Sequence, residues 1–260
     1  MNWPLETRQR VLAACREGRP YPETAARFGV PRGTVGYWVH ADRQRRGETA
    51  PERASACPRC DGLPLDRRAY SYLLGQYLGD GHIVSKRKQH HLSVYCCDGW
   101  PGVMAETEAA MLAVMPGYRT GRRQRPGCTE VKSYTAHWKC LFPQHGPGMK
   151  HTRPIVLEPW QQEIAAEHPW PLIRGLIHSD GCRVTNWTTT TLADGSSRRY
   201  EYPRYLFTNK SDDIRRVYSD ALDAVGVAWR VCRRGADPYH VSVARRASVA
   251  LMDEHVGEKS

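Results

Sequence analysis

The chain has 260 residues, 40% of them hydrophobic, so it can bury a core in one large domain or two smaller ones. With 38 Lys and Arg against 27 Asp and Glu, its formal net charge is +11, which favours a polyanionic partner such as nucleic acid. No apolar run approaches the roughly 20 residues that span a bilayer, and the first residues lack a signal-peptide pattern. Nine irregularly spaced cysteines do not form a disulfide framework, so we expect a protein of the reducing cytoplasm.

Residues 1–46 predict a small helical domain. Apolar positions suit a helix over 6–16, and a second short helix is expected over 22–28. Gly29 allows a tight turn, and Pro31 can begin a third helix, 31–43, where its missing N–H costs nothing. This pattern resembles the homeodomain-like helix-turn-helix of recombinases and small regulators, whose last helix enters the major groove of DNA. The candidate DNA contacts on this helix are Arg32, Thr34, Tyr37 and Trp38. The alternative is a plain three-helix bundle with the tryptophan in its core.

Residues 47–65 are polar and interrupted by Pro and Gly, which predicts a linker. Cys57 and Cys60 within it form a Cys-x-x-Cys knuckle, which is half of a tetrahedral zinc site. One later segment contains His137, Cys140 and His145, and we expect Cys140 and His145 to complete a structural Zn²⁺ site. Two unligated thiols in a linker are the alternative.

Two segments about 100 residues apart share one pattern. Residues 73–81 read LLGQYLGDG and residues 173–181 read IRGLIHSDG. Each predicts the end of an apolar helix, with small residues four apart that let two helices approach closely and a final Gly that stops the helix. Strand-like segments, a helix (103–114 and 214–225) and further strand-like segments follow each one. We therefore infer an internal duplication of α-β-β-α-β-β units. The small residues are Gly75 and Gly79 in the first copy, and Gly175 and Ser179 in the second.

The paired segments resemble the two motifs of a single-chain LAGLIDADG protein, the homing endonuclease family. The resemblance implies an α+β fold of two repeats, 66–165 and 166–256. In that fold the motif helices pack side by side at a pseudo-twofold axis, and saddle-shaped antiparallel sheets lie in the major groove. It also implies that Asp80 and Asp180, at the eighth motif position, are the catalytic acids. Lys210 stands near a strand-to-helix junction, where family members use a basic residue.

Two departures from the family pattern are visible in the sequence. The region around residues 97–99, where the first repeat would hold its counterpart of Lys210, contains no Lys or Arg. His178 replaces an acidic residue at the sixth motif position. This position faces away from the chemistry, so we expect His178 to be packed rather than catalytic.

The chemistry of the two carboxylates also points to a metal ion. A carboxylate at a helix C-terminus meets the negative end of the helix dipole, and two such ends brought together require a cation. Asp80 and Asp180 are therefore the expected ligands of Mg²⁺, which prefers oxygen. The expected reaction is hydrolysis of one phosphodiester bond on each DNA strand, performed by a monomer that carries both half-sites. A helix stop without chemistry is the alternative at each Asp-Gly.

Basic clusters fall in predicted strands and hairpins, where they would contact phosphates and make binding salt-dependent. A hairpin tip is predicted at Asp194-Gly195, beside one of them. For any single residue a solvated surface position is the alternative. The cluster residues are Lys86, Arg87, Lys88, Arg122, Arg123, Arg125, Arg198, Arg199, Arg233 and Arg234.

The sequence is compatible with two other functions. The first is a helix-turn-helix transcriptional regulator that keeps the LAGLIDADG fold for binding and does not cut, and the presence of both Asp80 and Asp180 counts against it. The second is an RNA-splicing maturase. The helix-turn-helix counts against that function, because the major groove of A-form RNA is too narrow for a recognition helix.

Overall fold

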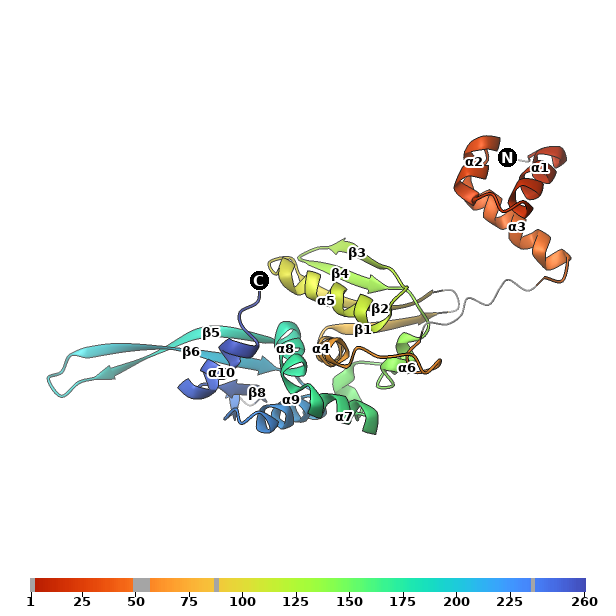
Figure 1. Ribbon diagram of the computed structural model, residues 1–260. Helices are drawn as coiled ribbons and strands as arrows, with labels where there is room; N and C mark the ends of the chain where they lie inside the picture. The colour runs from red at the N-terminus through yellow and green to blue at the C-terminus, as the bar shows by residue number, and fades with distance from the viewer. Residues whose placement is uncertain (1–2, 49–56, 87–88, 235–236) are drawn as a thin grey trace. The chain divides into compact units, whose positions relative to one another are not determined.

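The computed structural model describes residues 3–48, 57–86, 89–234 and 237–260. Packing divides the chain into two compact units, residues 1–55 and 56–260. Helices and antiparallel sheets occur in it together, so the protein is of the α+β class (Figure 1). Among the described residues, no helix is both long and apolar enough to cross a bilayer.

The smaller unit consists of the helices α1 (Leu5–Arg16), α2 (Tyr21–Phe28) and α3 (Arg32–Arg45). Each lies within two residues of its predicted bounds. Gly29 has a φ of 63°, the left-handed conformation that ends α2, as the sequence predicts. Pro31 is the N-cap of α3 rather than its first residue. The core of this unit consists of Val11, Leu12, Val30, Val35, Trp38 and Val39.

The larger unit contains the same arrangement twice: a helix, a β-hairpin, a second helix and a second hairpin. The first copy consists of α4 (Arg67–Leu78), β1 (Gly81–Lys86), β2 (Gln89–Cys97), α5 (Pro101–Val114), β3 (Thr120–Arg125) and β4 (Cys128–Ser133). The second copy consists of α8 (Pro169–Asp180), β5 (Gly181–Thr191), β6 (Ser197–Thr208), α9 (Asp212–Ala224), β7 (Arg230–Arg234) and β8 (Asp237–Val243). The antiparallel sheets have equivalent orders, β1-β2-β4-β3 and β5-β6-β8-β7, so the predicted duplication is confirmed.

Four further elements lie outside the repeat, and the sequence pattern does not predict them. The helices α6 (Trp138–Leu141) and α7 (Pro159–Glu167), with the 3₁₀ helix η1 (Lys150–Thr152) between them, connect the two copies. Helix α10 (Arg246–His255) follows the second copy. They matter for the site because η1, and the segment after α10, each bring a lysine to it.

The two copies meet where α4 packs against α8, near the centre of the larger unit in Figure 1. A Cβ atom on Gly75 would lie 2.6 Å from the carbonyl oxygen of Leu172, well inside van der Waals contact. A Cβ on Gly175 would likewise collide with the carbonyl oxygen of Tyr72. The small residues of the repeated motif therefore let the two helix backbones touch, as the sequence predicts.

One hydrophobic core runs through both copies. Its buried side chains include Leu73 of α4, Leu176 of α8, Val94 of the first sheet and Phe207 of the second. Because each motif helix contributes to the same cluster, the two copies stabilise each other and hold the ends of α4 and α8 in fixed relation.

The β5–β6 hairpin extends far beyond its sheet. β5 and β6 pair from Gly181 and Phe207 to Thr191 and Ser197, whereas β8 pairs with β6 only over residues 205–208. The rest of the hairpin is a two-stranded ribbon that projects from the unit (Figure 1). Gly195, with a φ of 81°, lies in the turn at its tip, where the sequence predicts a hairpin.

Candidate functional site

Two carboxylates lie at the ends of the packed helices. Asp180 is the last residue of α8, and Asp80 follows the end of α4 by two residues. A Cβ atom on Gly79 would lie 3.1 Å from the carboxyl carbon of Asp180, so the end of α4 is in contact with that side chain. The packing of α4 against α8 therefore brings Asp80 and Asp180 into one partly buried site.

Burial and charge repulsion make these carboxyl groups weaker acids than usual. Burial, followed by the charge of Asp180, raises the pKa of Asp80 to about 6. Burial also raises the pKa of Asp180, although Asn209 opposes the shift by donating a hydrogen bond of 2.6 Å to its Oδ2. Such a pair is unfavourable without nearby positive charge.

Lys150, which no sequence motif marks, supplies part of that charge. Its ammonium group, in η1, donates hydrogen bonds of 2.5 and 2.7 Å to the carbonyl oxygens of Tyr77 and Gly79. Burial lowers the pKa of Lys150 to about 8, and the charges of Asp180 and Asp80 oppose this effect. The lysine thus binds the end of α4 and lies within electrostatic range of both carboxylates.

Lys259 brings a second ammonium group from the segment after α10. It lies 3.5 Å from the carbonyl oxygen of Ser179, and burial lowers its pKa while the charge of Asp80 raises it. The next residue is held at the start of α5, because the N–H groups of Gly102 and Val103 donate to the carbonyl oxygen of Ser260 at 2.6 and 3.2 Å. Lys259 therefore brings a basic group toward the end of the acid pair from outside the first copy.

Lys210 follows the end of β6 by two residues. It lines a cavity of about 460 Å³ together with Asp180, Lys150 and Asn209. The structure therefore brings the three residues predicted from the LAGLIDADG resemblance to one region. Lys210 and Asn209 approach Asp180 from the second sheet, and Lys150 approaches from the connection between the copies.

His178 is a buried residue of α8 that packs against α4. Its Nδ1 is 3.0 Å from the hydroxyl of Tyr72, and the two rings are nearly perpendicular. Burial lowers the pKa of His178 to about 3, so its imidazole is neutral. His178 is therefore packed in the interior of the unit.

The first sheet presents a polar face opposite its hydrophobic one. Val94 and Val131 pair and are buried in the core, so their strand neighbours Tyr95 and Glu130 project from the opposite face. Glu130 accepts a hydrogen bond of 2.9 Å from Ser93 and lies 2.9 Å from the ammonium group of Lys132. Burial would raise the pKa of Glu130, but these donors hold it below its usual value. Its negative charge is thus balanced within the face.

The basic residues of β3 divide between the two faces of this sheet. Arg123 and Arg125 lie on the polar face, and Arg125 is 3.4 Å from Glu130. Arg122, by contrast, pairs with Val131 and forms an ion pair of 2.7 Å with Glu108 of α5. It lies on the helix-covered face, where the ion pair already engages its guanidinium group.

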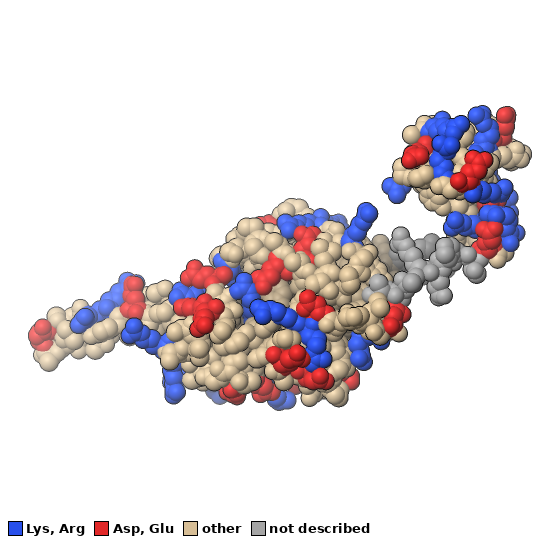
Figure 2. Space-filling view, in the orientation of Figure 1, with Lys and Arg blue, Asp and Glu red and all other residues tan. Residues whose placement is uncertain are grey.

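The second sheet shows the same division. The buried Phe207 fixes the strand alternation, which puts Arg198, Tyr200 and Arg204 on the polar face. Arg198 stacks on Tyr200, 5.2 Å from its ring centre. Arg199 projects from the opposite face, where it stacks on Trp187 at 4.9 Å and forms an ion pair of 2.6 Å with Glu201. Figure 2 shows basic side chains along this hairpin, mixed with acidic ones.

The remaining predicted basic contacts are only partly described. Lys86 and Arg233 have exposed side chains at the ends of their strands. Arg87, Lys88 and the side chain of Arg234 lie outside the described residues.

In the smaller unit, α3 has one exposed and one buried face. Arg32 and Tyr37 are exposed, with Tyr37 at 69%, and Thr34 is half-buried. Trp38 is only 7% exposed and packs edge-on against Trp3, with ring centres 6.4 Å apart. The structure therefore assigns Trp38 to the core and corrects its interpretation as a DNA contact.

Comparison with known proteins addresses both units. Residues 3–50 match the model of the homeodomain-like domain. One similar solved structure, from a study of mesophilic variants of the homing endonuclease I-DmoI, is 12% identical, with a TM-score of 0.50 over 73% of this chain and 89% of the other. Another, an I-DmoI variant in complex with its target DNA in the presence of magnesium, is 11% identical, with a TM-score of 0.50 over 73% and 96%. A search of curated protein sequences gave no match.

At this identity the likeness concerns the fold, and the two-copy arrangement around α4 and α8 agrees with it. The larger unit has the LAGLIDADG fold. Its two motif segments are residues 73–81 and 173–181, which form the α4–α8 contact and end at Gly81 and Gly181.

The LAGLIDADG unit also contains a cluster of sulfur and nitrogen ligands away from the acid pair. Cys57, Cys60 and Cys140 lie together, and the fourth member is His137 rather than the expected His145. His137 precedes Cys140 by three residues at the start of α6, which places both on one side of the helix. His145 lies beyond the end of α6, and its ring is 6.3 Å from that of His82.

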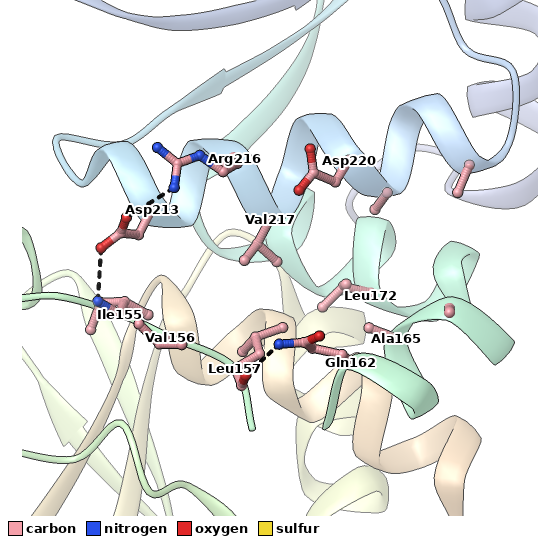
Figure 3. A pocket seen from close by; sticks show the side chains of 13 residues that line it. Ile155, Val156, Leu157, Gln162, Ala165, Leu172, Asp213, Arg216, Val217 and Asp220 are labelled. Carbon is pink, nitrogen blue, oxygen red and sulfur yellow. Dashed lines mark hydrogen bonds and ion pairs between the residues drawn. The ribbon is translucent and has the colours of Figure 1, made fainter. Parts of the chain in front are cut away.

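A further cavity of about 460 Å³ in the LAGLIDADG unit lies between α7, α9 and the segment before α7 (Figure 3). Its walls include Val156, Leu172 and Val217, and Asp213 on its rim accepts a hydrogen bond of 2.9 Å from the N–H of Ile155. It shares no lining residue with the cavity beside Asp180. It is a mainly apolar recess and not part of the candidate active site.

The lysines of the site show what the sequence pattern misses in a LAGLIDADG unit. Lys150 and Lys259 lie outside the helices and strands that the two copies share, so comparing one copy with the other cannot find them. The single available signal was the lack of a basic residue around 97–99, which indicates that positive charge must come from elsewhere in the chain.

Proposed function

We propose that this protein binds double-stranded DNA at a specific sequence and, as a monomer, hydrolyses one phosphodiester bond on each strand. The observation that carries the proposal is the meeting of Asp80 and Asp180 at the ends of two packed helices, between two sheets with polar faces. The net charge of +11 and the homeodomain-like segment support DNA as the substrate. The I-DmoI complex with target DNA supports the use of this fold for DNA recognition.

The acid pair has the chemistry of a site for a hard divalent cation. Both carboxyl groups have raised pKa values, and among the described residues only Asn209 donates a hydrogen bond to either carboxylate. Asp80 and Asp180 would hold Mg²⁺, which when bound polarises phosphate oxygens and makes a bound water more acidic. Asp80 must be ionised for this role, so metal binding should strengthen as the pH rises through about 6.

The other polar residues of the site have separate tasks in this proposal. Asn209 fixes the orientation of the Asp180 carboxylate. Lys150 holds the end of α4 and offsets the charge of the acid pair before DNA arrives. Lys210, at the edge of the same cavity, is placed to contact a phosphate of the bound strand.

DNA contact would extend along the polar faces of both sheets. Arg123 and Arg125 serve the first half, and Arg198 and Arg204 serve the second. A two-stranded ribbon fits the major groove, so the long β5–β6 hairpin would read bases on one side of the cut. The guanidinium group of Arg204 already donates a hydrogen bond of 2.6 Å to Ser242, which holds it in place on this face.

The test is a selection on a randomised duplex library. The wild-type chain and the Asp80→Asn/Asp180→Asn double variant are incubated with DNA and Mg²⁺; cut ends are sequenced and bound uncut DNA is recovered separately. We expect paired ends from the wild type alone, with both proteins enriching the same bound sequence. Asp220→Asn, at an exposed position of α9, is the matched control and should cut normally. Specific binding without Mg²⁺-dependent ends would disprove the nuclease.

One observation favours a second candidate, a transcriptional regulator that binds without cutting. Lys150 and Lys259 place two ammonium groups beside the acid pair, where they offset charge that a metal ion would otherwise balance. In the same selection, the regulator predicts bound DNA with no cut ends, whatever divalent ion is added.

A further inference from the structure

The Cys57–Cys60–His137–Cys140 cluster has the dimensions of a metal site. The Sγ atom of Cys60 lies 3.3 Å from that of Cys140 and 3.4 Å from Nδ1 of His137. The Sγ atom of Cys140 lies 3.8 Å from the same nitrogen, and the four ligand atoms all lie within 4.8 Å of one another. Bond lengths of about 2.3 Å to sulfur and about 2.0 Å to nitrogen predict tetrahedral edges of roughly 3.5 to 3.8 Å. The separations of the ligand atoms are therefore close to those around a zinc ion.

The local backbone holds the first two ligands in a tight turn. The N–H of Cys57 donates to the carboxylate of Asp61 at 2.9 Å, and the N–H of Asp61 donates to the carbonyl oxygen of Cys57 at 3.0 Å. Arg59, at the tip of the turn, stacks on Trp160 of α7 at 4.5 Å. Cys57 is fully buried, so the knuckle is packed against the larger unit rather than free in a linker.

The other two ligands are fixed by α6. His137 is the N-cap residue of this short helix and Cys140 is its third residue, so one turn carries both. The N–H of His137 donates to the hydroxyl of Thr135 at 3.2 Å, and the following Trp138 is fully buried in the core. Two segments about 80 residues apart in sequence thus bring together Cys and His side chains, the ligands of structural zinc sites.

We propose that Cys57, Cys60, His137 and Cys140 bind a structural Zn²⁺ ion. Four protein ligands leave no open position for water, so the site would not be catalytic. Its effect would be to fix the point at which the chain enters the larger unit, immediately before α4. A disulfide between Cys60 and Cys140 is the competing outcome, and metal analysis and thiol chemistry separate the two.

Metal content of the full-length chain, purified without chelators and with a reductant, is the first measurement. We expect about one zinc ion per chain. Replacement by Co²⁺ should produce the intense visible bands of tetrahedral coordination and the near-ultraviolet band of thiolate ligation. Less than about a tenth of an equivalent of any transition metal, together with no cobalt spectrum after reduction, would overturn the proposal.

Variants then assign the ligands. Cys60→Ser and Cys140→Ser should each lower bound zinc about tenfold or more, whereas His137→Cys should keep the ion and strengthen the thiolate band of cobalt. His145→Ala and Cys15→Ser are the controls and should bind zinc normally. Loss of metal in His145→Ala but not in His137→Ala would refute this ligand set.

A readout on the wild-type chain remains decisive even where a cysteine variant fails to fold. Stepwise modification of the thiols should release zinc in proportion, and the freed ion is measured with a colorimetric chelator. Recovery of a Cys60–Cys140 disulfide from protein kept under reducing conditions, with no zinc released, would contradict the proposal. Because none of these readouts involves DNA cleavage, the zinc site and the proposed nuclease can fail independently.

Discussion

The ionisable residues of the candidate site are unfavourable for folding and suited to chemistry. Burial raises the pKa of Asp80 and of Asp180 and lowers that of Lys150 and of Lys259, so each group is less easily charged than in water. These groups are held there by the packing of α4 against α8 and by two segments outside the repeat. Perturbed pKa values of this kind concentrate at functional sites.

The raised pKa of Asp80 predicts a stability penalty that depends on pH. Its usual value is 3.8 and its folded value is about 6, so the penalty is absent below about pH 4 and complete above about pH 6. Asp80→Asn should therefore stabilise the metal-free protein by up to about 3 kcal/mol at pH 8, and not at pH 4. Thermal unfolding at both pH values measures this, with Asp220→Asn, at an exposed position of α9, as control. Mg²⁺ should stabilise the wild type more than the variant; equal responses would argue against metal binding by Asp80.

The ammonium group of Lys150 allows a second test of the acid pair. Lys150→Met removes the ammonium group beside the acid pair, so the pKa of Asp80 should rise further. We expect the pH at half-maximal cleavage to move upward and cleavage at pH 7 to fall about 10- to 100-fold, with little change in DNA affinity. Lys139→Met, at an exposed position of α6, is the control. An unchanged pH profile would mean that Lys150 acts only as a link to α4.

The sequence predicts the acid pair but not its surroundings. Asp80 and Asp180 can be predicted because the motif occurs twice, and a repeat is recognised from the sequence alone. Lys150 and Lys259 are not, because each reaches the site through tertiary packing of a unique segment. The same reason explains why Cys140 was predicted with His145 instead of His137, since only the turn of α6 decides which histidine faces the sulfur atoms.

At the level of elements, the α4–α8 contact depends on glycine. Gly175→Ala would place a methyl group against the carbonyl oxygen of Tyr72. Backbone atoms there can move aside only by separating the two helices. We expect a loss of about 1–3 kcal/mol or more from the stability of the larger unit, measured by urea denaturation. Gly36→Ala in α3 has no neighbour within 4 Å and should instead stabilise its helix by about 0.5–1 kcal/mol. Wild-type stability in Gly175→Ala would mean that the helices can separate at little cost.

The β5–β6 ribbon supplies its own matched control. Arg198→Ala and Tyr200→Ala remove side chains from the polar face, so each should weaken DNA binding, and Arg198→Ala should reduce the salt dependence by about one phosphate contact. Arg199→Ala changes the opposite face, where Glu201 already pairs with the arginine, and should have little effect. Titrations at several salt concentrations measure both. Equal losses of DNA affinity in Arg198→Ala and Arg199→Ala would show that DNA binding is not confined to one face of the ribbon.

Strand alternation explains why clusters in the sequence do not show which basic residues lie on the polar face of a sheet. Arg122 and Arg123 are adjacent in sequence, yet one forms an ion pair with Glu108 of α5 and the other projects from the polar face. A cluster of arginines therefore predicts a charged strand, whereas the pairing register decides which of them can meet DNA. The length of the β5–β6 ribbon likewise follows from pairing that continues past the end of β8, which the sequence does not mark.

At the scale of the whole molecule, the chain joins two compact units, each with its own core. If both bind one DNA molecule, the second contact becomes intramolecular and raises the overall affinity well above that of either unit. The smaller unit would then determine how tightly and where the protein binds, whereas the acid pair would determine where it cuts.

This division of tasks predicts the effect of changing the exposed face of α3. The Arg32→Ala/Tyr37→Ala double variant should lower the affinity of the full chain for its selected site about 10- to 100-fold, shorten the footprint at one end, and leave the cut positions unchanged. Trp38→Ala differs in mechanism, because it removes a buried side chain and should unfold the smaller unit, with similar loss of affinity but also loss of helical signal. Footprinting and circular dichroism on the same preparations distinguish the two. If the double variant moved the cut site, the smaller unit would be positioning the catalytic centre, and the two tasks would not be separable.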